Sequence, residues 1–198
     1  MIWAALLLGA GLTGLLWWVT ARRMTQVSDG PIVAPRPGCA LLLVDLQAAS
    51  WSASRYGEAI RTGVEAAVAR DVSVAQDRNT PVIALKQEVS TPIARLIAPR
   101  AASGPLAAPF QGMADHVVTR WAEDGFETGE LDNLLDVLGV GRLRIMGQDG
   151  AHSLARTAQA ALDRGLEVEL VLDGIVATDR ERFEGAIEAL VAQGARRV

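Results

Sequence analysis

The stretch Cys39-Ala-Leu-Leu-Leu-Val-Asp45 decides the fold of this chain. An unbroken apolar run that ends in an acidic residue is typical of a strand that is buried on both faces of a parallel sheet. Four further strand patterns follow it, at residues 81–86, 116–120, 142–147 and 167–173. The sequence therefore predicts a sheet of five strands.

Helical patterns lie between these strands, at residues 58–75, 131–138, 153–164 and 179–193. Strands that alternate with helices indicate a three-layer α/β/α domain with a mainly parallel sheet. In such sheets, binding and catalytic sites form beyond the carboxyl ends of the strands. Asp45, Arg120 and the segment after Gly147 are all expected at that edge.

An uncharged apolar run, Ile2–Val19, precedes this domain. As a helix of 18 residues it would be about 27 Å long, close to the hydrocarbon thickness of a bilayer. The run is apolar all round, which argues against a helix of a soluble core. No lysine or arginine precedes it and it does not end in small residues, which argues against a cleaved signal peptide. We predict a transmembrane helix over residues 1–20, an irregular linker rich in proline and glycine over 21–38, and one domain over 39–198.

The flanks of the run predict its orientation. Positive charge lies only on the C-terminal side, at Arg22, Arg23 and Arg36, so the positive-inside rule places the C-terminal domain in the cytoplasm of a single-pass protein of the bacterial inner membrane. Small residues recur four apart in the run, and this spacing lets helices pack closely in lipid; they are Ala5 with Gly9 and Ala10 with Gly14. The expected partners are membrane lipid and other membrane-protein subunits, unless these residues only reflect the usual composition of membrane helices.

Composition excludes several kinds of partner and site. The net charge is −4 and no basic cluster occurs beyond the membrane-proximal arginines, so no nucleic acid is expected. A single cysteine, Cys39, excludes an internal disulfide and fits a reducing compartment. Two histidines, His116 and His152, without ligand spacing predict no metal, and nothing in the sequence calls for a cofactor.

Three segments in order resemble the isochorismatase-like (cysteine) hydrolase superfamily, which includes nicotinamidases, carbamoylases and isochorismatases. Leu43-Val-Asp-Leu-Gln47 is similar to the first-strand signature, and residues 117–126 are similar to the segment that carries the catalytic lysine. The third segment begins at Gly147 and reproduces the family spacing of +6, +10, +14 and +18 with Ser153, Thr157, Ala161 and Gly165. The resemblance covers about residues 39–198.

The resemblance implies a catalytic triad whose members are changed here. The family's aspartate is kept as Asp45, its lysine position holds Arg120, and its cysteine position holds Ser153. The family also has threonine at the position of Gly150 and aspartate or asparagine at that of Ala151. Asp45, Arg120 and Ser153 are therefore the candidate site residues, as a degenerate triad.

The changes alter the chemistry that the site can perform. A cysteine thiol has a pKa near 8.5, and its surroundings can lower this pKa to about 4–7. A serine hydroxyl is far more basic and needs a general base, while an arginine, with a pKa above about 12, cannot shuttle a proton. We therefore expect no amidase activity of the family's cysteine type.

Structural alternatives exist for each candidate. Ser153 could be an ordinary helix N-cap, which stabilises by about 1 kcal/mol, and Asp45 with Arg120 could be a structural ion pair. His152 is adjacent to Ser153, but neighbouring residues at a helix start point in different directions. The metal of nicotinamidases needs histidines after the first two strands, and residues 47–61 and 86–95 contain none.

Three functions remain open. The first is a membrane-anchored, non-catalytic protein that acts as an accessory or assembly subunit of an inner-membrane complex. The alternative is a divergent hydrolase of vinyl ethers or C–N bonds, in which Asp45 protonates the substrate. The third is a pocket that binds a small anionic molecule without turnover, with Trp51 and Trp121 expected nearby.

Overall fold

The computed structural model describes residues 14, 17–19, 22, 25–88 and 104–198 of the chain. Its centre is a six-stranded sheet in the order β3-β2-β1-β4-β5-β6, and all neighbouring strands are parallel. The strands are β1 (Gly38–Val44), β2 (Val82–Gln87), β3 (His116–Arg120), β4 (Val140–Gln148), β5 (Glu167–Val176) and β6 (Arg196–Arg197). The predicted parallel sheet is confirmed.

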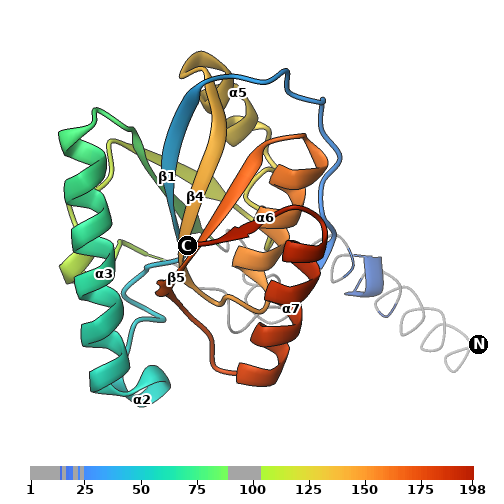
Figure 1. Cartoon of the computed structure of the whole chain (residues 1–198). Helices are drawn as coiled ribbons and strands as arrows, with labels where there is room; N and C mark the ends of the chain where they lie inside the picture. Colours follow the sequence, from blue (N-terminus) through green and yellow to red (C-terminus); the bar gives the residue numbers. More distant parts are fainter. Residues whose placement is uncertain (1–13, 15–16, 20–21, 23–24, 89–103) are drawn as a thin grey trace, which may run out of the picture.

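Helices cover both faces of the sheet, and the prediction of three layers is therefore also confirmed. The helical elements are α2 (Ala53–Tyr56), α3 (Glu58–Asp77), η1 (Ala108–Phe110), α5 (Glu130–Val137), α6 (Ser153–Asp163) and α7 (Arg180–Ala192). Figure 1 shows α3 on one side of the sheet and α6 and α7 on the other. This arrangement follows from right-handed crossovers, because the chain leaves β1 toward one edge of the sheet and β4 toward the opposite edge.

The apolar stretch quoted first forms the central strand β1. Its residues Leu41 to Val44 are no more than 1% exposed, since β2 and β4 flank the strand and helices cover both faces. The run is apolar throughout because the strand is buried on both faces, as expected for an inner parallel strand.

Three short elements were not predicted: α2, η1 and β6. Each has two to four residues, which is too few to produce a periodic pattern. Strand β5 also extends to Val176, past the predicted end at Asp173, because the pairing register between β4 and β5 shifts after Ile145.

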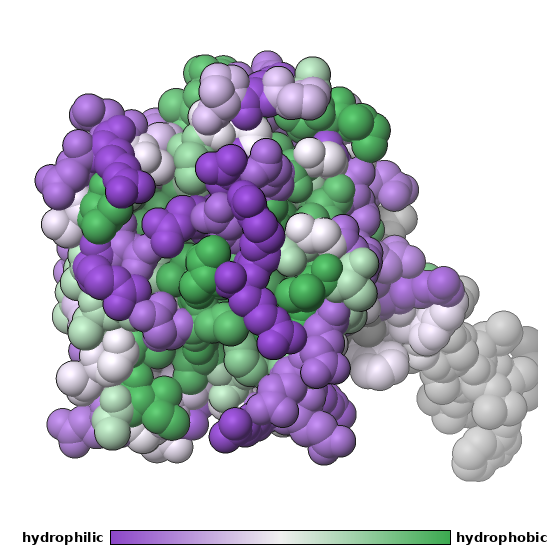
Figure 2. All heavy atoms as spheres, in the orientation of Figure 1, coloured by the Kyte–Doolittle hydropathy of each residue, from purple (hydrophilic) through white to green (hydrophobic). Residues whose placement is uncertain are grey.

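The edge strand β6 is short and charged. Arg196 pairs with Glu167 and Glu169 at 3.0 and 2.9 Å, and Figure 2 shows hydrophilic residues across the middle of this view, near the C-terminus. Short, charged edge strands discourage pairing with another sheet.

The segment before β1 is irregular, as predicted for a linker, but it is docked on the domain. Residues 27–36, here called the N-terminal strap, contain no helix or strand. The Val33 amide donates to the Arg164 carbonyl at 2.7 Å, and Arg36 pairs with Asp136 at 2.5 Å. Figure 1 shows the strap as the blue segment that runs along the domain to the start of β1.

Most of the predicted transmembrane helix, with Ala5, Gly9 and Ala10, lies outside the described residues. Gly14 and residues 17–19 are helical and exposed, and a Cβ at Gly14 would meet nothing within 4 Å. Within the described part of the chain, no helix is both long enough and apolar enough to cross a membrane.

Candidate functional site

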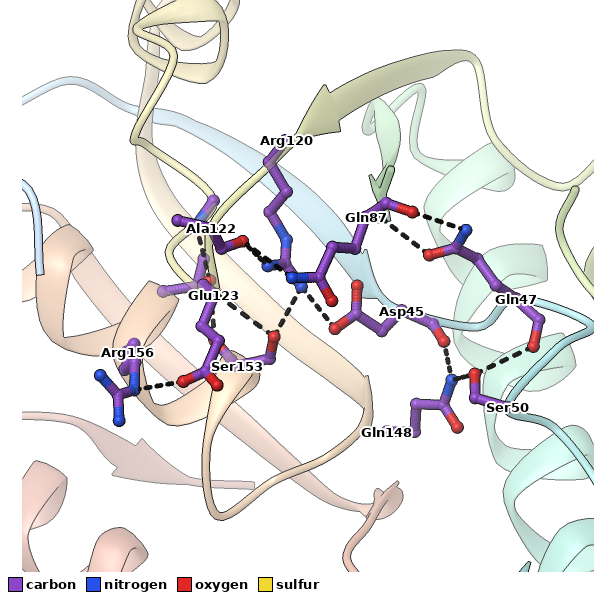
Figure 3. A network of polar contacts seen from close by, with 12 residues as sticks. Asp45, Gln47, Ser50, Gln87, Arg120, Ala122, Glu123, Gln148, Ser153 and Arg156 are labelled. Carbon is purple, nitrogen blue, oxygen red and sulfur yellow. Dashed lines mark hydrogen bonds and ion pairs between the residues drawn. The ribbon is translucent and has the colours of Figure 1, made fainter. Parts of the chain in front are cut away.

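The three predicted site residues meet at the carboxyl edge of the sheet. Asp45 follows β1, Arg120 is the last residue of β3, and Ser153 is the first residue of α6, which follows β4. Figure 3 shows their side chains pointing toward one another. The structure thus brings the three candidate residues together at the edge where the sequence places them.

Arg120 is the centre of this cluster. Its side chain is fully buried, and its Nη2 donates to Asp45 Oδ2 and, at 2.6 Å, to Ser153 Oγ. Its Nη1 donates to the carbonyl of Ala122. The ion pair that the sequence offered as an alternative for Asp45 and Arg120 is present, and the guanidinium also holds the serine.

Asp45 has an unusual backbone and one free carboxylate oxygen. Its φ is 56°, a left-handed conformation that aspartate tolerates better than most residues. Its carbonyl accepts from Gln148 Nε2, which also contacts Ser50 Oγ. The residue is only 5% exposed, yet Oδ1 has no hydrogen-bond partner among the described residues.

Ser153 does not cap its helix, so that alternative is wrong. The N-cap is His152, no side chain bonds the first helical amides, and Ser153 itself begins the helix. Its Oγ instead accepts from Arg120 and donates to the Glu123 carbonyl at 3.3 Å. No hydrogen bond links His152 to Ser153 in the described structure, so no imidazole is in place to act as its base.

A pair of glutamines fixes the ends of β1 and β2 beside the triad. Gln47 Oε1 accepts from the Gln87 amide at 2.8 Å, and Gln47 Nε2 donates to the carbonyls of Gln87 and Gly104, both at 3.0 Å. The sequence reasoning missed Gln87 and Gln148. Both end apolar strand runs, as Asp45 does, and that signal could have found them.

A cavity of about 590 Å³ opens beside the triad. Its lining comes from the loops after β3, β4 and β5 and from α2 and α7, and consists of Arg55, Glu123, Asp149, His152, Thr178, Asp179 and Arg182. None of the triad residues lines it. Glu123 nevertheless connects the cavity with the triad, because it lines the cavity and its carbonyl accepts from Ser153. Its carboxylate pairs with Arg156 at 2.8 Å (Figure 3).

Two groups near the cavity, the half-buried Asp149 and the buried Tyr56, have raised pKa values. Burial raises the pKa of Asp149, and the negative charge of Asp45 adds to this. The positive charges of His152, Arg55 and Arg120 act in the opposite direction and lower it. Burial raises the pKa of Tyr56 to about 12, and its hydroxyl has no partner among the described residues. Uncharged forms of both groups are therefore favoured.

The tryptophans expected near the pocket do not line this cavity. Trp51 is buried between Tyr56 and Phe110, with ring centroids 5.7 and 5.1 Å away, and it donates to Glu65 at 2.7 Å. Trp121 is 54% exposed, next to Arg120.

Cys39 lies at the opposite end of β1 from Asp45, and partial burial raises its pKa.

The residues present do not fit a metal ion. Among the described residues, no group of three or more histidine, cysteine, aspartate or glutamate side chains is placed to hold one. The side chain that reaches Asp45 is instead a guanidinium, which is a permanent cation.

Comparisons with known proteins agree with this architecture. A family model, the isochorismatase domain, matches residues 39–197, whereas comparison with curated protein sequences gives no match. Pyrazinamidase of Pyrococcus horikoshii in complex with zinc aligns with a TM-score of 0.67 and 21% identity, over 82% of this chain and 99% of that one. N-carbamoylsarcosine amidase from Thermoplasma acidophilum aligns with a TM-score of 0.66 and 18% identity, over 81% of this chain and 95% of that one.

A third solved structure, an isochorismatase-like hydrolase from Alkaliphilus metalliredigens, aligns with a TM-score of 0.69 and 15% identity, over 81% of this chain and 94% of that one. At these identities the solved structures show the fold alone.

Proposed function

The chain belongs to the isochorismatase family, and we propose that it is a membrane-anchored member that does not hydrolyse amides and serves as an accessory or assembly subunit of a bacterial inner-membrane complex. The observation that carries this proposal is the position of Arg120. Its fully buried guanidinium holds both Asp45 and Ser153, the two groups that would have to act on a substrate.

This arrangement opposes nucleophilic catalysis by Ser153. A serine nucleophile needs an adjacent base that accepts its proton. Ser153 Oγ faces a permanent cation on one side and directs its proton to the Glu123 carbonyl on the other. Asp45 Oδ2 accepts from the same guanidinium, and Oδ1 has no hydrogen-bond partner among the described residues, so neither oxygen is bonded to the serine there.

The proposal of a membrane anchor comes from the N-terminal run. Ile2–Val19 carries no charge, and arginines follow it at 22 and 23, so the domain is placed on the cytoplasmic side. The guanidinium of Arg22 lies over the Trp18 ring, 5.2 Å from its centroid. A run with small residues at Ala5, Gly9, Ala10 and Gly14 favours a partner helix as well as lipid.

Two experiments on the full-length protein test this function. Extraction in mild detergent from its native membrane should yield a complex with other membrane proteins, and replacement of Gly9 and Gly14 by leucine should release the chain from it. Replacement of Leu8 and Leu12 by isoleucine is the matched control, since it leaves the small residues in place. Recovery of a lone monomer in every preparation would refute the accessory role.

A second candidate, a divergent hydrolase, is favoured by Asp45 Oδ1, which is buried and has no hydrogen-bond partner among the described residues. Protonation of a vinyl ether needs an acid but no nucleophile, so the loss of cysteine does not exclude it. Turnover of isochorismate, nicotinamide or a carbamoyl compound, lost on Asp45→Asn, would establish this function. Binding of a small carboxylate without turnover, lost on Arg120→Ala, would instead establish a ligand-binding role.

A further inference from the structure

The N-terminal strap is held by one buried arginine at the end of α6. Arg164 is 1% exposed and donates from Nη1 to the Ser28 carbonyl at 2.9 Å and from Nη2 to the Asp29 carbonyl at 3.2 Å. Its Nε and Nη2 bind the Asp132 carboxylate at 2.7 and 3.2 Å, and its guanidinium lies 4.4 Å from the Phe126 ring centroid. The strap carbonyls thus satisfy donors that would otherwise be buried without partners.

A second contact joins the same strap residue to the loop after β3. The Ser28 amide donates to Asp124 Oδ2 at 2.7 Å. Asp124 is fully buried, and its other carboxylate oxygen accepts from the Phe126 amide at 3.0 Å. Ser28 is therefore fixed from both sides, through its carbonyl by Arg164 and through its amide by Asp124.

The loop that Asp124 anchors is the loop that holds the site. The two residues before it, Ala122 and Glu123, supply the carbonyls that accept from Arg120 and Ser153. Within the described structure, Asp124 is the only one of these three loop residues that forms a hydrogen bond with the strap.

We propose that Ser28, Asp124 and Arg164 form a latch through which the N-terminal strap positions the loop over residues 121–127 and keeps the Asp45–Arg120–Ser153 site closed. Because the strap lies between the apolar N-terminal run and β1, a partner that displaces the strap would loosen the loop and expose Arg120. The latch is a positioning device, and it does not depend on the proposed accessory function.

Gly30 offers a way to undock the strap without changing a latch residue. A Cβ at this position would lie closer than 3.0 Å to the guanidinium of Arg164. Arg164 is buried and its donors are engaged, so the strap is the part that must move. The backbone of Gly30 lies outside the left-handed region, which means that alanine adds the clash alone. Gly63→Ala in α3 is the matched control, since a Cβ there meets nothing within 4 Å.

The test measures hydrogen exchange and arginine labelling on the full-length protein in mild detergent. In Gly30→Ala we expect amide exchange over residues 122–126 to rise about tenfold or more, the effect of losing a charged hydrogen bond. Arg120 should become reactive toward phenylglyoxal, while amides of β1 and β4 stay protected. Gly63→Ala should match the unchanged protein in every readout.

The opposite pattern would overturn the latch. If the Ser28 and Val33 amides exchange faster in Gly30→Ala while the loop and Arg120 remain protected, the loop holds itself. A second pair of variants covers loss of folding: Ser28→Pro removes the amide that binds Asp124, whereas Ser28→Ala keeps it. Loop exchange that is equal in these two variants also refutes the proposal.

Discussion

Replacing Arg120 by methionine tests whether the site is a locked ion pair. The Arg120 side chain is fully buried and that of Asp45 is 8% exposed, so the substitution leaves a buried carboxylate without its counter-charge. Breaking a buried pair from one side costs about 3–5 kcal/mol. The hydroxyl of Ser153 also loses its 2.6 Å donor, which adds roughly 1 kcal/mol. The expected loss of unfolding free energy, about 4–6 kcal/mol, is a large part of the roughly 5–15 kcal/mol of a typical domain.

The double variant Asp45→Asn/Arg120→Met removes both charges together. Asparagine suits the positive φ of Asp45, so the backbone should not be strained. Buried pairs that are replaced as a unit are often close to neutral in stability. We expect the double variant to lose only about 1–2 kcal/mol, clearly less than the sum of the two single losses.

Urea unfolding of the full-length protein in detergent, followed by circular dichroism at pH 7, measures these differences. Arg182→Met is the matched control, because Arg182 is 69% exposed and pairs with Asp179 at the surface. Its cost should stay below about 1 kcal/mol. The reasoning is refuted if Arg120→Met costs no more than Arg182→Met, or if the double variant loses the full sum of the single losses.

Three further predictions concern the surroundings of the site. Tyr56 is the only tyrosine of the chain, so absorbance at 295 nm should give one midpoint at about 12, and stability should fall as pH rises from 10 toward that value; a midpoint near 10 would contradict its burial. Burial also raises the pKa of Asp149 above its ordinary value of 3.8, so the folded state favours the protonated form and loses stability as pH rises from there. Asp149→Asn should therefore raise the melting temperature more at pH 7 than at pH 3, and an equal change at both would refute this. Gly147→Ala should destabilise by at least about 3 kcal/mol in urea, because φ is 141° and a Cβ would approach the backbone of Val44 closer than 3.0 Å, whereas Gly185→Ala, with open space, should not.

The strand ends could be read from the sequence because burial leaves a simple pattern. Both faces of β1 are covered, so its residues are uniformly apolar, and the first polar residue after the run marks the edge of the sheet. Asp45 and Arg120 were placed correctly for this reason. The sequence left the partners of the Arg120 side chain open. They could not be predicted because they depend on how the fold brings Ala122, Ser153 and Asp45 within hydrogen-bond distance of the guanidinium.

Docking of the strap left no such pattern. Proline and glycine in residues 21–38 predict an irregular segment, and residues 27–36 contain no helix or strand, but the partners of this strap are distant in sequence. Ser28 lies 96 residues from Asp124 and 136 residues from Arg164. No local periodicity encodes such contacts, and a buried arginine at the end of α6 looks, in the sequence, like an ordinary surface residue.

Arginine stands at position 120, where the resemblance to the family implies a lysine, and this residue affects how the site opens. A lysine that is desolvated can lose its proton, and it would then release a carboxylate partner. The guanidinium of Arg120 uses two separate nitrogens to hold Asp45, Ser153 and the Ala122 carbonyl. Movement of the loop that carries Ala122 and Glu123 would remove the acceptors of Arg120 and Ser153 and so open the cluster. That loop is fixed through Asp124 to the strap, so control over the site passes to the segment that connects it with the N-terminal run.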